Sequence, residues 1–200
     1  QFCDRDIRHT AWASRGKVGN YIQRYNLSPT NLTSHSSRFF LGLPMQCAEC
    51  HDHKTEPWYQ EDYYSMASFF SNVRSKAVYE KNDRGQDQLV SWVLRDENKG
   101  SIRMPDSNQE IFPRFLDGNI YRGVAQKKRE ALSKWVTDRK NPYFSPAIVN
   151  RIWSQFMGRG FVEPLDAFGE EHPSTHPELL DWLAEDFARY GYNLQHLMKT

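Results

Sequence analysis

The spacing of apolar residues predicts a chain built mainly from helices. Over residues 57–70, apolar side chains recur at the interval that places them on one face of a helix. Similar apolar stripes run through residues 125–139, 145–157 and 176–190. Gly158 and Gly191 follow the last two stripes, where glycine commonly ends a helix. We therefore expect a mainly α fold made of irregular helical domains.

A shorter segment of the chain has the pattern of a β-strand. Apolar and polar residues alternate at 90–94, as they do in strands with one buried face. An Asn-Lys-Gly turn follows, and residues 101–103 are candidates for a returning strand. This pattern predicts at most a small β-hairpin near residues 89–103. Residues 74–88 are charged, and we expect them to form a loop.

An irregular stretch near residues 104–112 is the expected domain boundary. It predicts a first domain over residues 1–104, which contains a cysteine motif, and a helical companion domain over residues 105–200. The chain begins without Met or a signal-peptide pattern and stops within a helical pattern. We expect it to be a piece of a longer protein, truncated at both ends, so its lack of a signal does not argue against export.

The cysteine motif is the most informative feature for function. Residues 47–51 read Cys-Ala-Glu-Cys-His, which is the spacing that attaches c-type haem. Cys47 and Cys50 would form the thioether bonds, and His51 would be the axial ligand of the iron. Met66 is a candidate for the sixth ligand. A haem held in this way carries single electrons.

A different metal site competes with haem at the same motif. His53 follows closely, and Cys47, Cys50 and His53 with one remote ligand would suit zinc. Cys3, His35 or a carboxylate could supply that ligand. A closed site would give a metal-stapled structural or interaction module, and an open site a metal-dependent hydrolase acting on extracellular polymers. An unligated dithiol or disulfide formed by Cys47 and Cys50 is a third alternative. The sequence leaves open whether the chain is an enzyme.

A second candidate cluster lies near the C-terminus, at Arg151, Asp166 and His176. Arg151 sits within the apolar stripe of a predicted helix. We expect it to form a buried ion pair with an acid such as Asp166, which would pin the following loop to the helix. An anionic-ligand site is the alternative. His176 is expected to make a local hydrogen bond at a helix start, and Asn150 to cap or bridge backbone groups.

Composition narrows the range of functions. The chain has 26 basic and 25 acidic residues, so it lacks the basic excess that non-specific nucleic-acid binding requires. Three cysteines are too few for a dense disulfide framework. No apolar run is long enough for a transmembrane helix.

Several ordered blocks of this sequence resemble the cytochrome-like domain of secreted planctomycete-type proteins and its C-terminal companion domain. The blocks are residues 40–43, 47–54, 57–58, 60–64, 113–118, 141–144, 149–153, 156–160, 164–166 and 173–184. Two positions depart from the family pattern. Thr175 is inserted between Ser174 and His176, and Ala167 stands where the family has a second acidic residue. Both departures weaken any site carried over to this loop.

The resemblance implies export and a cytochrome-like domain of unestablished activity. With the motif, it leads to the expectation of an exported c-type haem protein that transfers electrons within a larger multidomain protein. Haem c would be the cofactor, with zinc as the alternative. The partner would be a redox protein or a flanking cytochrome domain, and the location periplasmic or secreted.

Overall fold

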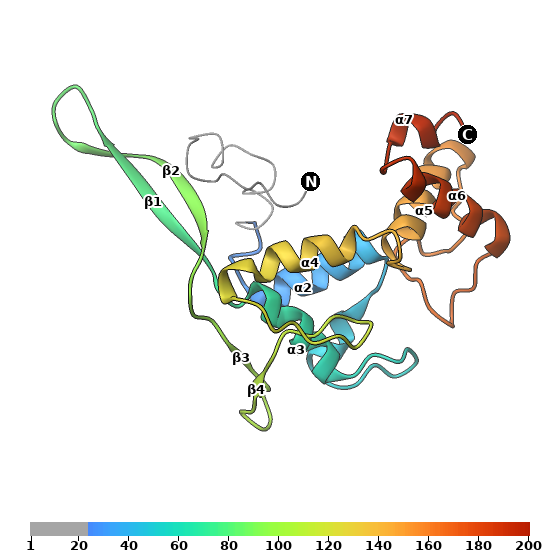
Figure 1. Ribbon diagram of the computed structural model, residues 1–200, viewed down its shortest axis with the longest axis horizontal. Coiled ribbons are helices and arrows are strands. Elements are labelled where there is room, and N and C mark those ends of the chain that lie inside the picture. The colour runs from blue at the N-terminus through green and yellow to red at the C-terminus, as the bar shows by residue number, and fades with distance from the viewer. Residues whose placement is uncertain (1–23) are drawn as a thin grey trace. The chain divides into compact units, whose positions relative to one another are not determined.

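The computed structural model describes residues 24–200 (Figure 1). Its elements in chain order are α2 (Pro29–Ser36), the π-helix η1 (Ser37–Leu41), the 3-10 helix η2 (Met45–Glu49), α3 (Gln60–Ala67), the 3-10 helix η3 (Ser68–Phe70), β1 (Val73–Lys81), β2 (Asp87–Asp96), β3 (Ile102–Arg103), β4 (Glu110–Ile111), the 3-10 helix η4 (Ala125–Lys127), α4 (Lys128–Val136), α5 (Phe144–Met157), α6 (Pro177–Arg189) and α7 (Leu194–Leu197). Over this range, no helix combines the length and the apolar character that crossing a membrane requires.

The chain forms two compact units. The first unit contains described residues 24–33 and 64–133, and the second contains residues 34–63 and 134–200. The chain passes from one unit to the other within α2, α3 and α4. The predicted division into domains 1–104 and 105–200 stays a prediction.

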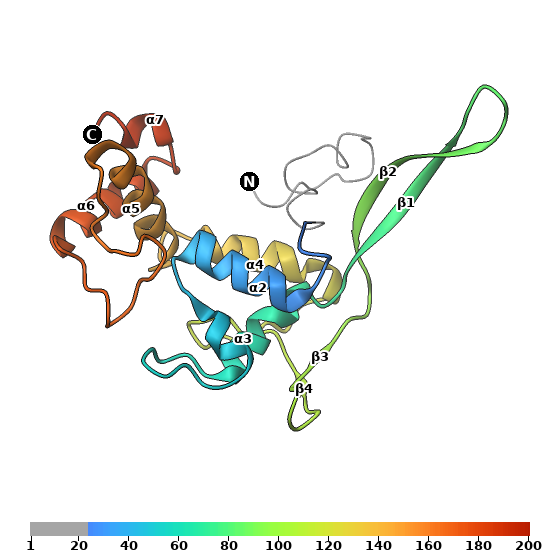
Figure 2. The ribbon, with the colours of Figure 1, turned by 180° about the vertical axis from the view of Figure 1, so that it is seen from behind.

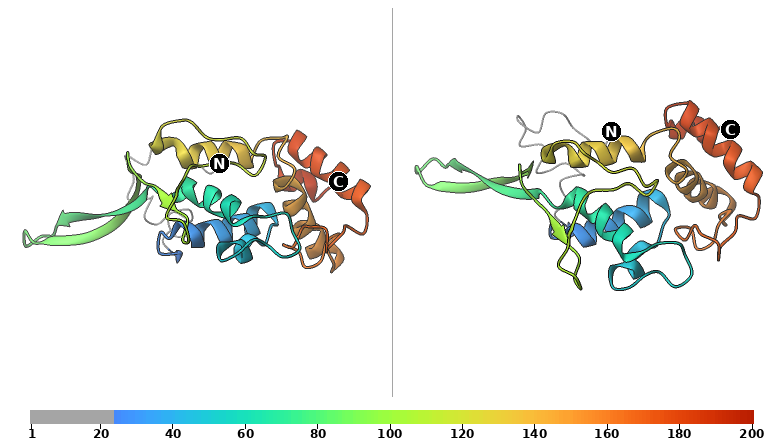
Figure 3. Two further views of the ribbon diagram at one scale, coloured as in Figure 1. Left: turned by 90° about the horizontal axis from the view of Figure 1, so that it is seen from below. Right: turned by 60° about the horizontal axis from the view of Figure 1, so that its bottom comes forward.

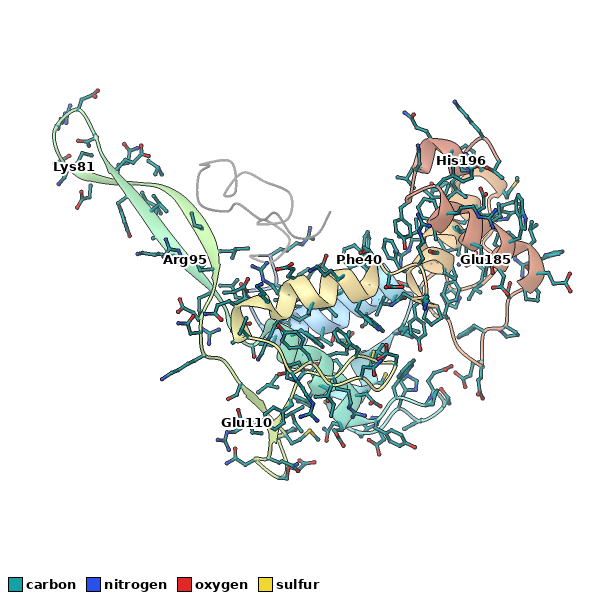
Figure 4. All side chains as sticks on the ribbon, viewed as in Figure 1. Phe40, Lys81, Arg95, Glu110, Glu185 and His196 are labelled. Carbon is teal, nitrogen blue, oxygen red and sulfur yellow. The ribbon has the colours of Figure 1, made fainter. Side chains whose placement is uncertain are left out.

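Strands β1 and β2 of the first unit form a long antiparallel ribbon (Figures 1 and 2). Val73 pairs with Asp96 at one end and Lys81 with Asp87 at the other, with a register shift after Val78. In the connecting turn, the Asn82 side chain accepts hydrogen bonds from two backbone amides. The shorter strands β3 and β4 form a second antiparallel pair. Figure 4 labels Lys81 near the tip of the ribbon.

These strands overturn the prediction of a mainly α fold with at most a small hairpin near residues 89–103. Both helices and antiparallel strands build the described chain, so its fold is mixed. Residues 90–94 do form a strand, but they pair with the upstream segment that we expected to be a loop. Residues 101–103 contribute to β3, whose partner is β4.

The physical reason for this error lies in the ribbon's exposure. A two-stranded ribbon leaves much of both faces in water, so its sequence needs no strict alternation of apolar and polar residues. Over β1, only Val73 is buried, and the remaining positions are exposed or half-buried. The sequence of β1 therefore lacks the apolar–polar alternation from which a strand could have been predicted.

The apolar core of the second unit forms where α5 packs against α6 (Figure 3). Its buried side chains come from both helices, from the loop between them and from α7. They are Val149, Phe161, Val162, Leu180, Leu183, Ala184, Phe187 and Leu197. The predicted helix stops are confirmed, because Gly158 follows α5 and Gly191 lies just beyond α6, both with positive φ.

Asn150 organises the loop that leaves this core. Its side chain is fully buried on α5. Its Nδ2 donates to the carbonyl oxygens of Val162 at 3.0 Å and Leu165 at 3.3 Å. Its Oδ1 accepts from the amides of Phe161 at 2.7 Å and Val162 at 3.1 Å. The expectation that Asn150 bridges backbone groups is confirmed, and four backbone groups of an irregular segment, three of them in buried bonds, depend on one amide.

Replacing Asn150 by Ala should lower the free energy of unfolding by about 3 kcal/mol, because buried polar groups lose their partners. Urea unfolding followed by circular dichroism measures the loss. The exposed Asn119→Ala serves as the matched control and should change stability by less than about 0.5 kcal/mol. Equal effects of the two variants would contradict this role of Asn150.

Candidate functional site

The Cys-x-x-Cys-His motif lies on η2 and the residues directly after it. Side chains three positions apart lie on the same side of a 3-10 helix, because three residues complete one turn. Met45 and Ala48 form one such pair, and both are fully buried. Cys47 and Cys50, which follows η2 as its C-cap, form another, and both are exposed free thiols. The helix therefore buries one pair and presents the two sulfurs to solvent.

The hydrogen bond of His51 fixes the tautomer of its exposed ring. Nδ1 lies 2.7 Å from the backbone oxygen of Asp52. A carbonyl oxygen only accepts, so Nδ1 carries the proton and donates it. In the neutral ring, Nε2 then bears the lone pair. Metal-ligating histidines commonly have this arrangement, in which one nitrogen donates to a carbonyl and the other faces the metal.

His53 has the opposite hydrogen-bond pattern. Its Nδ1 accepts from the backbone amide of Glu56 at 3.1 Å and, more weakly, from that of Thr55 at 3.4 Å. An amide donor requires a lone pair on Nδ1, so Nε2 carries the proton of the neutral ring. The backbone amide of His53 also donates to the oxygen of Trp58 at 2.8 Å. His53 therefore closes the loop after the motif, and its accepting nitrogen is already in use.

The loop after the motif is tied to the start of α3. Asp52 Oδ1 accepts from the backbone amide of Gln60 at 2.8 Å, which satisfies a free donor at the helix start. The Gln60 side chain in turn donates to the backbone oxygen of Glu49 at 3.1 Å. The Tyr63 hydroxyl donates to the Glu49 carboxylate at 3.2 Å. These bonds hold the middle of the Cys-x-x-Cys-His segment, at Glu49, and the residue that follows the segment, Asp52.

The segment before the motif is fixed at a glycine. Gly42 ends η1 with a φ of 71°, a conformation that disfavours other residues. Its carbonyl accepts from the Phe168 amide at 2.9 Å. A Cβ atom at this position would come within 2.7 Å of the Phe168 ring. The close approach therefore also requires glycine.

Arg151 on α5 holds the same segment from another direction. Its guanidinium donates to the backbone oxygen of Arg38 at 2.9 Å and also to that of Phe39. It lies 4.7 Å from the centre of the Phe39 ring, within the range of a cation–π contact. Burial lowers the pKa of Arg151, and the charge of Asp166 partly opposes this effect. Figure 4 labels Phe40, the next residue of η1.

The predicted ion pair between Arg151 and Asp166 is wrong, because Asp166 pairs with Arg38. Arg38 Nε lies 2.5 Å from Asp166 Oδ2, and Arg38 Nη2 lies 3.4 Å from Asp166 Oδ1. This hydrogen bond and the charge of Asp166 raise the pKa of Arg38. Arg151 instead satisfies carbonyl groups of η1. The Arg38 side chain is 58% exposed, so the pair contributes little to stability.

The remaining predicted site residues are His176, Met66, His35 and Cys3. His176 is exposed at the start of α6, with its Nδ1 3.2 Å from Thr175 Oγ1, in line with the expected local hydrogen bond. Met66 belongs to the first unit and is 3% exposed, so its role as a sixth ligand stays a prediction. Cys3 lies outside the described residues, and His35 is exposed. Within residues 24–200, no three His, Cys, Asp or Glu side chains converge as a metal site would require.

Comparison with known families finds two matches, both to families of unknown function. Residues 7–75 are similar to PSCyt2, a protein of unknown function (DUF1549), and residues 128–200 to PSD1, a protein of unknown function (DUF1553). The first match includes the Cys-x-x-Cys-His motif, and the second includes α5, α6 and α7. Both fit the expected resemblance to a two-part family of unknown function. Neither the curated proteins nor the solved structures contain a match.

Arg151→Met should lower the free energy of unfolding by about 2 kcal/mol, because two carbonyl groups lose a charged donor. Arg38→Met, which removes an exposed pair, should cost less than about 1 kcal/mol. Exposed Arg159→Met is the control. Urea denaturation ranks the three variants. A larger loss for Arg38 than for Arg151 would contradict the assignment of Arg151 as the anchor.

Nitrogen-15 NMR of the imidazole rings in alkaline buffer tests the two histidine assignments. We expect His51 to be protonated at Nδ1 and His53 at Nε2, because their backbone partners impose opposite roles. His51→Gln and His53→Gln assign the signals. The same tautomer at both rings would refute the distinction.

Proposed function

We propose that this chain is the haem-carrying part of an exported c-type protein that transfers electrons within a larger multidomain protein. Haem would be attached through Cys47 and Cys50, with His51 as the proximal ligand. The observation that carries this proposal is the tautomer of the His51 ring. Its Nδ1–H is held by a backbone carbonyl, so Nε2 has the lone pair in the residue that directly follows two exposed thiols.

The donor set fits haem c better than it fits the zinc alternative. Haem c needs two thiols and one imidazole from the protein, and Cys47, Cys50 and His51 supply these groups. Zinc bound by Cys47, Cys50 and His53 would have to compete with the backbone amides for Nδ1 of His53 or change its tautomer. The hydrogen bonds of His53 therefore favour a structural role for that residue.

A buried donor in the same loop offers further support. The indole Nε1 of Trp58 is buried, and none of the residues that the structure describes accepts its hydrogen bond. Buried donors of this kind are rare unless an absent group satisfies them. An acidic substituent of a bound cofactor, such as a haem propionate, would be a suitable acceptor.

Haem supplies one-electron redox chemistry when it is bound. The residues of this chain would attach, orient and shield it. Asp52 and the bonds around Glu49 hold the attachment segment, and Gly42 and Arg151 fix the segment before it.

The proposal entails export, because covalent haem attachment takes place outside the bacterial cytoplasm. The resemblance to secreted planctomycete-type proteins agrees with a periplasmic or secreted location.

Expression with a signal peptide and c-type maturation machinery should yield a coloured protein. Its Soret absorption should survive acid–acetone extraction, since thioether bonds keep haem on the chain. The double variant Cys47→Ser, Cys50→Ser should lose this absorption. His51→Ala should lose or alter it, because the proximal ligand is removed, while His53→Ala should keep it.

Two results would overturn the proposal. One is a folded wild-type protein that leaves maturation without covalent haem. The other is one equivalent of zinc by elemental analysis, lost in the Cys47→Ser variant with no haem bound. Circular dichroism of each variant separates a loss of haem from a loss of folding.

A further inference from the structure

The first unit contains a cleft that the proposed haem function does not use. Its volume is about 590 Å³, which suits a small organic molecule. Its walls come from η3, the segment before β3, β4, the loop after β4, η4 and the start of α4. All of the residues that line it belong to the first unit, so one compact unit forms the whole cleft.

Much of the cleft wall is apolar. The residues that line it include Ile111, Phe112, Pro113, Ile120 and Tyr121. Phe112 is 69% exposed and Ile120 is 51% exposed, so large apolar side chains are open to a ligand. Covering them would remove apolar surface from water, which favours binding of a ligand with an apolar body.

Lys128 gives this cleft a buried positive charge. It is 8% exposed and lines the cleft at the first residue of α4. Its Nζ donates to Ser71 Oγ and to the backbone oxygen of Gly100, both at 3.0 Å. Both acceptors are neutral, and an ammonium group has three donors. One donor of the ammonium group therefore has no acceptor among residues 24–200, and Lys128 is one of the residues that line the cleft.

The surroundings of Lys128 offset its charge only in part. No carboxylate among residues 24–200 lies within ion-pair distance of Nζ, and a cation at a helix start opposes the helix dipole. Burial lowers the pKa of Lys128, and the charge of Glu110 partly opposes this effect. A buried charge without an ion-pair partner is costly, and an anionic ligand would supply that partner.

The other charged residues of the cleft set the orientation of a ligand. Arg122 and Glu110 both line it and are exposed, and Figure 4 labels Glu110 on β4. Arg122 favours an anion, whereas Glu110 disfavours one on its own side. An anionic group would therefore meet Lys128, and an apolar body would contact Phe112 and Ile120.

We infer that this cleft binds a small carboxylate with an apolar body, whose charged group pairs with Lys128. The site is independent of the haem proposal, because its residues belong to the first unit and include none of the Cys-x-x-Cys-His motif.

Calorimetric titration of the full chain with 4-phenylbutyrate and with its neutral amide tests this inference. The two probes share a shape and differ in charge. Wild type should bind the carboxylate about tenfold more tightly than the amide, because only the carboxylate pairs with the ammonium group. Lys128→Met should abolish this preference while keeping the amide affinity. Lys127→Met, at an exposed neighbour outside the cleft, should leave the preference unchanged.

A second variant covers the case in which Lys128→Met does not fold. Glu110→Gln removes a repelling charge at an exposed position, so it should strengthen carboxylate binding severalfold and leave amide binding unchanged. The inference is overturned if wild type binds neither probe, if it binds both equally, or if Lys128→Met and Lys127→Met behave alike. It is also overturned if Glu110→Gln has no effect on the carboxylate.

Discussion

The structure depends on side chains that satisfy the backbone groups of irregular segments. Buried amides and carbonyls must find partners, and in a chain with long stretches between its regular elements many partners are polar side chains. Asn150 serves four such groups in the loop after α5. Arg151, its neighbour, serves two carbonyls of η1. One turn of a helix thereby orders both the loop after α5 and the π-helix η1, which explains why polar residues interrupt its apolar stripe.

The same constraint shapes the Cys-x-x-Cys-His segment. Asp52 satisfies the start of α3, and His53 satisfies amides within the loop. His51 donates to a carbonyl instead of accepting from an amide. The two histidines thus differ in tautomer because their backbone partners differ in kind. The segment combines a firmly held loop with three exposed side chains, Cys47, Cys50 and His51, on which the proposed haem attachment rests.

The sequence predicted the parts of the fold that have a strong hydrophobic period. The helices that contain Val149 and Leu183 bury one face, and glycines end them as expected. Strand β1 was missed because all of its residues after Val73 are exposed or half-buried. The roles of Arg38 and Lys128 were missed for another reason. An Arg beside two phenylalanines and a Lys in a charged helix have no distinctive spacing, and only the folded chain gives them their partners.

The ribbon also bears on how the molecule behaves among its own copies. Strands that end a sheet expose amides and carbonyls that can recruit strands from other molecules. Along β1, charged side chains such as Lys76 and Glu80 are exposed, and Lys81 pairs with Asp87 at the tip. Charges at such edges hinder stacking between chains. Among the residues that the structure describes, the ribbon therefore contains its own barrier to edge-to-edge pairing between molecules.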